Sequence, residues 1–255
     1  MPVMDEFCEE REALKNADLK TKWQYFLDYY KWWVVGIAAG LAFVISMIHS
    51  ALTAKDNALF GYFLNTYAVE ENTPSFITGF AETAGIDLKE YDIMLDSSLQ
   101  YNTTDSYDES TYTSSQKIMV TIAAADVDFM AADEEAFEYY GTTDTFHDLR
   151  DIYTEEELEK FKDYLYYVDM DVIREKEEVV EAGNFEGYVT PVYDHLAPEE
   201  MADPVPIGFC IQDSPKLADT YYFRSGNVPL GIVVNTQRLD AAKQFVEYLF
   251  EGLVE

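Results

Sequence analysis

The sequence has little cysteine, and the positions of its cysteines exclude a disulfide framework. Only Cys8 and Cys210 occur among 255 residues. They lie on opposite sides of a long apolar run, so they could not pair if that run spans a bilayer. Neither belongs to a CxxC pair of the kind that ligates zinc. We therefore expect two free thiols.

Cations are also scarce, which excludes one class of partner. The chain has 17 Lys and Arg against 49 Asp and Glu, a formal net charge of -32. Nucleic-acid binding depends largely on cations that displace condensed counterions, so we expect neither DNA nor RNA as a partner. Such a surface stays soluble and attracts cations. A hydrophobic content of 48% excludes disorder throughout the chain.

Catalytic motifs are missing as well. The sequence contains no GxxxxGK[ST], HExxH, GxSxG or GxGxxG. Asp126 and Asp128 share one face of an expected strand, but a calcium site needs about six oxygen ligands and no spaced loop supplies them. Carboxylate pairs for glycoside hydrolysis stay open, because only their distance in space defines them. We expect a protein that is not an enzyme, with no catalytic residue, metal or cofactor.

What the sequence does have is one long uncharged run, "WWVVGIAAGLAFVISMIHSALTA", over residues 32–54. A helix of this length crosses a hydrocarbon core of about 30 Å. Trp32 and Trp33 lie where aromatic rings settle at a membrane interface. A cleaved signal peptide is the alternative, but a charged and aromatic segment precedes the run and Leu52 stands where cleavage requires a small residue. We predict a transmembrane helix over 32–54.

The lysines flanking this run indicate its orientation. Lys55 stands alone after it, whereas four lysines precede it: Lys15, Lys20, Lys22 and Lys31. The positive-inside rule then places the N-terminus in the cytoplasm and residues 56–255 outside the cell membrane, as a single-pass protein. Apolar residues at helical spacing in 1–31 predict a cytoplasmic juxtamembrane amphipathic segment.

The outer region alternates between expected strands and helices. Helices are predicted to start at Thr73, at Asp133 and at a capping box formed by Thr154 and Glu157, with Gly85 ending the first of them. We expect strands over 58–65, 91–98, 127–132, 164–173, 206–214 and 228–236, and helices over 73–85, 114–126, 134–141, 155–164, 214–222 and 239–253. Strands separated by helices predict an α/β domain with a largely parallel sheet.

Three stretches of this region carry a resemblance. "ADVDFMAADEEAFEYYGTTDTFHDLRD", "DPVPIGFCIQDSPKL" and "GNVPLGIVVNTQRLDAAKQFVEYLF" resemble successive elements of bacterial extracellular solute-binding proteins of the type 2 periplasmic-binding fold. "YFLDYYKWWVVG" is similar to the start of small single-pass proteins of Gram-positive bacteria. The resemblance implies a periplasmic-binding-protein-like α/β domain over 56–255. Because these residues are few for two complete lobes, it implies a reduced form of that domain.

The resemblance implies capture of a small molecule, a sugar, peptide or amino acid, for a transporter or sensor. The alternative is a non-catalytic extracellular protein interaction module of an envelope complex that keeps the fold without a small ligand. The partners are then the bilayer and either the ligand or a membrane protein. A specific ligand would distinguish the first from the second.

Ligands of open α/β sheets meet the carboxyl ends of strands and the N-termini of helices. The residues at such positions form the expected ligand-binding set: Asp96, Ser97, Ser98, Asp133, Tyr221, Tyr222, Ser225 and Asn227. Tyr221 and Tyr222 could stack on a ligand or fill the core. The other carboxylates of 122–149 are expected to be helix caps and solvated charges, and His147 an exposed turn residue.

Overall fold

The computed structural model describes residues 18–53, 55–102, 108–183, 189–224 and 226–254. It divides into two compact units, Met1–Ala54 and Lys55–Glu255. The described part of the first unit forms the helix α2 (Leu19–Thr53). Within it Lys31–Ser50 is long and apolar enough to cross a membrane, as an anchor or as a signal sequence. The amphipathic segment predicted over 1–31 lies mostly outside the described residues.

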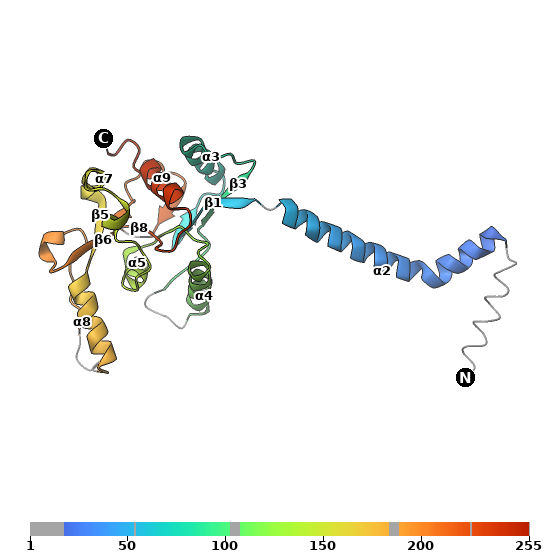
Figure 1. The fold of residues 1–255 in the computed structure, drawn as a ribbon, viewed down its shortest axis with the longest axis horizontal. Helices are drawn as coiled ribbons and strands as arrows, with labels where there is room; N and C mark the ends of the chain where they lie inside the picture. Colours follow the sequence, from blue (N-terminus) through green and yellow to red (C-terminus); the bar gives the residue numbers. More distant parts are fainter. Residues whose placement is uncertain (1–17, 54, 103–107, 184–188, 225, 255) are drawn as a thin grey trace. The chain divides into compact units, whose positions relative to one another are not determined.

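The second unit, which we call the α/β domain, is built on a six-stranded sheet (Figure 1). Its strand order is β3-β1-β4-β8-β6-β5. The strands are β1 (Asp56–Phe63), β3 (Tyr91–Asp96), β4 (Phe129–Ala131), β5 (Leu165–Asp169), β6 (Pro204–Cys210) and β8 (Pro229–Ile232). The prediction of an α/β domain is therefore confirmed.

The sheet is mixed, so the prediction of a largely parallel sheet is wrong. β1 pairs in parallel with β3 and with β4. β8 is antiparallel to both β4 and β6, and β5 is antiparallel to β6. A parallel neighbour needs a crossover, usually a helix. The helix expected over 214–222 between β6 and β8 does not form: the chain makes turns and then β7 (Tyr221–Phe223), so β8 returns antiparallel.

Helices cover both faces of the sheet because the strand side chains alternate between two cores. Leu59 and Phe63 of β1 join one core, and Phe60 and Tyr62 join the other. The first core is covered by α3 (Thr73–Ala84), α9 (Leu239–Leu249) and the short helices α6 (Leu149–Ile152) and α7 (Glu155–Lys160). The second is covered by α4 (Glu109–Ala123), α5 (Glu134–Gly141) and α8 (Met170–Glu181) (Figure 1).

Three of the predicted helix boundaries are confirmed, whereas one predicted N-cap and one predicted strand end are wrong. Asp133 caps α5, the Thr154–Glu157 capping box begins α7, and Gly85 ends α3 in the left-handed conformation. The N-cap of α3 is Asn72 and not Thr73. The strand expected over 164–173 ends at Asp169, because that carboxylate caps α8, a helix that the sequence analysis missed.

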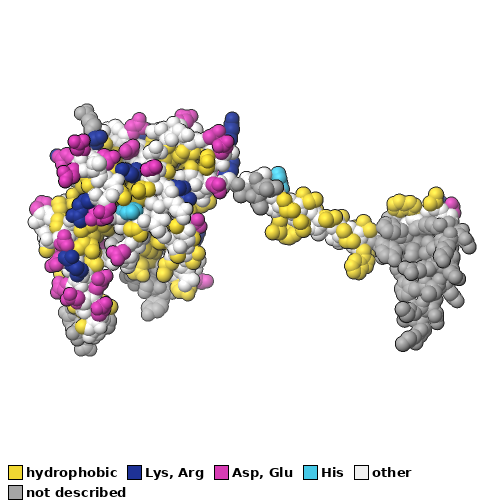
Figure 2. Space-filling view, in the orientation of Figure 1, with side chains coloured by type: hydrophobic (Ala, Val, Ile, Leu, Met, Phe, Trp, Pro, Cys, Tyr) yellow, Lys and Arg dark blue, Asp and Glu magenta, His cyan; other side chains and the backbone are white. Residues whose placement is uncertain are grey.

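The surface of the α/β domain is acidic, as its composition requires. Figure 2 shows Asp and Glu side chains across the visible face of this domain, with far fewer Lys and Arg. Hydrophobic side chains are exposed along the described part of α2, as a membrane-spanning helix would have them (Figure 2).

Candidate functional site

One edge of the sheet collects most of the expected ligand-binding residues. β1, β3 and β4 end there, and β8, which runs the other way, begins there. Asp96, Ser97 and Ser98 therefore share this edge with Asp133 after β4 and with Asn227 before β8. Ser225 lies outside the described residues.

The carboxylate of Asp96 is already used by the protein. It accepts hydrogen bonds from the backbone N–H and the hydroxyl of Ser98, at 2.8 and 2.6 Å. It also forms an ion pair with Lys117 of α4 at 2.6 Å. Burial opposes its ionisation, but Lys117 and Ser98 outweigh that effect and hold the pKa of Asp96 below its usual value. Asp96 thus shapes the turn after β3 and ties it to α4.

The carboxylate of Asp133 is also occupied by hydrogen bonds within the protein. Asp133 lies after β4, next to β1, where the chain changes from adding strands on one side of β1 to adding them on the other. Its carboxylate accepts from the backbone N–H of Ala136 at 3.0 Å and from the side-chain amide of Asn65 at 2.7 Å. Asn65 is buried and left-handed, with a φ of 54°. Its amide also bonds both backbone groups of Tyr101 at 2.8 Å. Asn65 thus links the end of β1 to the residue that follows β4 and to the segment around Tyr101, and no sequence pattern predicted this role for Asn65.

The two adjacent tyrosines of β7 lie in different surroundings. β7 pairs antiparallel with β2 (Thr66–Ala68), apart from the main sheet. Tyr222 is 53% exposed, whereas Tyr221 is only 4% exposed. The Tyr221 ring packs against Phe63 and Phe76, with ring centroids 4.5 and 5.5 Å away. Tyr221 is therefore held rigidly and Tyr222 is free at the surface.

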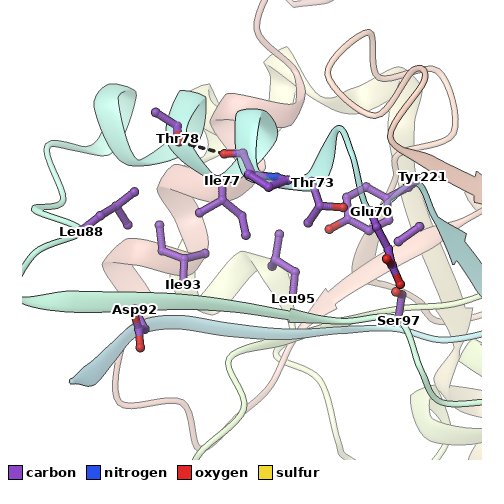
Figure 3. Close-up of a pocket in the computed structure, with 12 residues that line it drawn as sticks. Glu70, Thr73, Ile77, Thr78, Leu88, Asp92, Ile93, Leu95, Ser97 and Tyr221 are labelled. Carbon is purple, nitrogen blue, oxygen red and sulfur yellow. Dashed lines mark hydrogen bonds between the residues drawn. The ribbon is translucent and has the colours of Figure 1, made fainter. Parts of the chain in front are cut away.

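A cavity of about 570 Å³ lies between α3 and β3 and reaches β7 (Figure 3). Figure 3 shows Ile93 and Leu95 rising from β3 toward Ile77 of α3. Aliphatic side chains form half of the lining: Ala68, Pro74, Ile77, Leu88, Ile93 and Leu95. A volume of this size suits a small molecule. We call it the α3–β3 pocket, and of the expected residues Ser97 and Tyr221 line it.

The hydroxyl of Tyr221 is the distinctive polar group of this pocket. It is buried and has no hydrogen-bond partner among the described residues. Thr73, beside it, donates its own hydroxyl to the carbonyl of Val69 at 3.0 Å. Burial raises the pKa of Tyr221 to about 12, and the neighbouring Thr73 hydroxyl, which lies outside hydrogen-bond geometry, interacts with it weakly and partly offsets the effect. A buried hydroxyl without a partner costs about 1–3 kcal/mol, so a ligand that supplies one gains by doing so.

A second cavity, of about 480 Å³, lies between α5 and α8. Charges of both signs line it, from Lys176, Glu177 and Glu181. None of its lining residues is a buried polar group without a partner in the described part of the chain. The α3–β3 pocket is therefore the better candidate.

Other ionisable groups correct the expectation of solvated charges. Asp128 is fully buried and pairs with Arg238 at 2.8 Å. His147 is half-buried and not an exposed turn residue, and burial lowers its pKa despite the nearby Asp151.

Cys210 is a buried free thiol, and burial raises its pKa to about 12. Among the described residues, no group of three or more His, Cys, Asp or Glu could hold a metal ion.

Comparison with known proteins finds no counterpart: no family model, no curated protein and no solved structure matches this chain. Its function has therefore to be inferred from its own residues.

Proposed function

We propose that this chain is a single-pass membrane protein whose α/β domain lies outside the cell and captures a small molecule for a transporter or sensor. The apolar segment Lys31–Ser50 supports the anchor. The excess of lysine before that segment supports a cytoplasmic N-terminus. The site of capture is the α3–β3 pocket.

The observation that carries the proposal is the unpartnered Tyr221 hydroxyl in the lining of that pocket. Ligand sites combine a mostly apolar lining with a few placed polar groups. Here the apolar side chains of α3 and β3 surround Tyr221, which its aromatic neighbours hold in place. Among sugars, peptides and amino acids, this lining favours a peptide with an apolar side chain.

The fold supports a reduced relative of the solute-binding proteins that the sequence resembles. A parallel trio, β3-β1-β4, has covering helices on both faces. The described part of the α/β domain forms one main sheet, as a single lobe of such a protein would. The pocket accordingly lies within the lobe, between a helix and an edge strand, and needs no second lobe to form.

The second candidate function is an interaction module of an envelope complex without a small ligand. Its support is the internal use of Asp96 and Asp133 at the carboxyl edge of the sheet, where open α/β sheets usually bind ligands. It predicts a membrane protein that co-purifies in a fixed ratio with this chain and no small-molecule ligand.

The test is a thermal-shift screen of the full chain in detergent micelles against sugars, amino acids and short peptides. A ligand at 100 times its Kd stabilises the folded state by about 2.7 kcal/mol. Thr78→Trp should abolish the shift, because exposed Thr78 lines the pocket and an indole there would occupy it. Tyr221→Phe should weaken binding about three- to tenfold while leaving the free protein as stable or slightly more stable.

Thr83→Trp is the matched control. Thr83 and Thr78 are both exposed on α3, and each donates its hydroxyl to the carbonyl four residues earlier. Thr83 does not line the pocket, so its replacement should leave the shift intact. A hit that survives Thr78→Trp would place binding elsewhere. A cooperative melt with no hit would contradict ligand capture and favour the interaction module.

A further inference from the structure

Three polar groups of the α3–β3 pocket gather at one end, whereas Asp92 and Thr78 lie toward the other. In Figure 3, Glu70, Ser97 and Tyr221 lie at that end, and Leu88 lies at the other. Two hydrogen bonds tie the turn that carries Glu70 to the residues just before β7. The backbone N–H of Val69 donates to the carbonyl of Thr220 at 2.8 Å, and the side-chain amide of Asn72 donates to the carbonyl of Asp219 at 2.7 Å. The Glu70 carboxylate is thus presented by an anchored turn.

Glu70 differs from the other carboxylate of the pocket. Asp92 lies 3.5 Å from Lys55, which also donates to the carbonyl of Leu88 at 2.6 Å. No described residue forms a hydrogen bond or an ion pair with the Glu70 side chain, and neither Lys nor Arg lines the pocket. One unpaired and exposed negative charge therefore lines the same pocket as the hydroxyls of Tyr221 and Ser97.

The start of α3 gives an anion no donors at this end. Thr73, Ser75 and Phe76 already donate their backbone N–H groups to carbonyls of the preceding turn. Pro74 has no N–H to give. A helix N-terminus attracts anions chiefly through such free N–H groups. The start of α3 therefore offers an anion none of its usual donors, and the Glu70 carboxylate and the acidic surface around it favour a cation over an anion at this end.

We infer that the ligand of the α3–β3 pocket carries a primary ammonium group on an apolar body. The ammonium would donate to the Glu70 carboxylate and the apolar body would lie between Ile77 and Leu95. Tyr221 or Ser97 would bind a further polar group of the ligand. This inference rests on the proposed function, since it names the ligand class of the same pocket.

Three probes with one aromatic body test it: 2-phenylethylamine, 2-phenylethanol and phenylacetate. Their affinities would be measured by titration calorimetry on the full chain in detergent micelles, with protein-free micelles as the blank. The amine should bind about two- to fivefold more tightly than the alcohol, the range of an ion pair with an exposed carboxylate such as that of Glu70. Phenylacetate should bind most weakly.

Glu70→Gln should reduce the affinity for the amine to that for the alcohol and leave the alcohol unaffected. Glu71→Gln is the matched control, because Glu71 is the adjacent exposed glutamate and does not line the pocket. Equal binding of amine and alcohol, or an amine affinity that Glu70→Gln leaves unchanged, would overturn the ammonium assignment. If no probe binds but the library screen yields another class, the assignment fails and ligand capture stands; if the library also yields nothing, ligand capture fails.

Discussion

Replacing Asp128 with alanine is expected to lower the free energy of unfolding of the α/β domain by about 3–5 kcal/mol. Asp128 is 0% exposed. It accepts from the backbone N–H of Phe60 at 2.7 Å and from Arg238 Nε at 2.8 Å, and the hydroxyl of Thr236 also donates to it. Its loss leaves a guanidinium and a buried N–H without their acceptor, which costs far more than the pair itself contributes.

Asp126→Ala is the control for this substitution. Asp126 is exposed and lies two residues before Asp128. Arg238 donates to the backbone carbonyl of Asp126 and not to its side chain. That bond survives the substitution, so the change should stay within about 0.5 kcal/mol. Denaturant unfolding of both variants with unchanged slopes measures the difference. A loss below about 1 kcal/mol for Asp128→Ala would show that the buried pair does not hold β1 and the segment before α9 together.

The second large effect is expected from Asp169→Asn, and it depends on pH. Asp169 is 5% exposed and accepts from the backbone N–H groups of Ala202 at 2.8 Å, Asp203 at 3.1 Å and Asp171 at 3.0 Å. Burial opposes its ionisation, but these N–H groups outweigh burial and hold its pKa below the ordinary 3.8. At pH 7 the asparagine variant should lose about 1–3 kcal/mol, because an amide accepts these bonds more weakly.

The direction of the pH dependence follows from the lowered pKa. A carboxylate with a lowered pKa contributes stability that is present above 3.8, its unfolded value, and is lost as pH falls through its folded value. The gap between the wild type and Asp169→Asn should therefore narrow from pH 5 toward pH 3. Asp171→Asn is the control: Asp171 is 66% exposed and pairs with Arg174, so its effect should be small at every pH. A gap for Asp169→Asn that stays constant with pH would contradict the charged role of this carboxylate.

Features set by neighbouring residues were predictable from the sequence. The cap at Asp133, the capping box at Thr154 and the left-handed Gly85 each depend on residues within one helical turn. β1 and α9 were found for the same reason, since their apolar patterns repeat over many residues. The boundary at Asp169 was missed because two aspartates in "VDMDVI" look alike, and only one of them is buried against the segment of residues 202–203.

Features set by distant partners were not predictable. Asp128 and Arg238 are 110 residues apart, and nothing near Asp128 shows that its charge is paired. Asn65 likewise meets Asp133 across 68 residues. β8 is antiparallel to β6 because residues 211–224 form turns and pair β7 with β2 in place of a crossover helix.

The α3–β3 pocket illustrates the same limit. Its lining comes from α3, β3, β7 and the turn before α3, and only Ser97 and Tyr221 were among the expected ligand-binding residues. The general rule for open sheets predicts a site at the carboxyl edge. There, however, Asp96 forms an ion pair with Lys117 and Asp133 accepts a hydrogen bond from Asn65. No sequence pattern marks Tyr221 as the buried tyrosine of an adjacent pair.

Hydrogen exchange of the full chain, with and without the first ligand that the screen yields, tests the central claim most directly. The account predicts slower exchange over 73–78, 91–97 and 221–223, the segments of α3, β3 and β7 that line the pocket. It predicts no change around Asp133, whose edge of the sheet is already filled. Protection around Asp133 and Asn227 with none in α3 or β3 would contradict the account and return the site to the carboxyl edge.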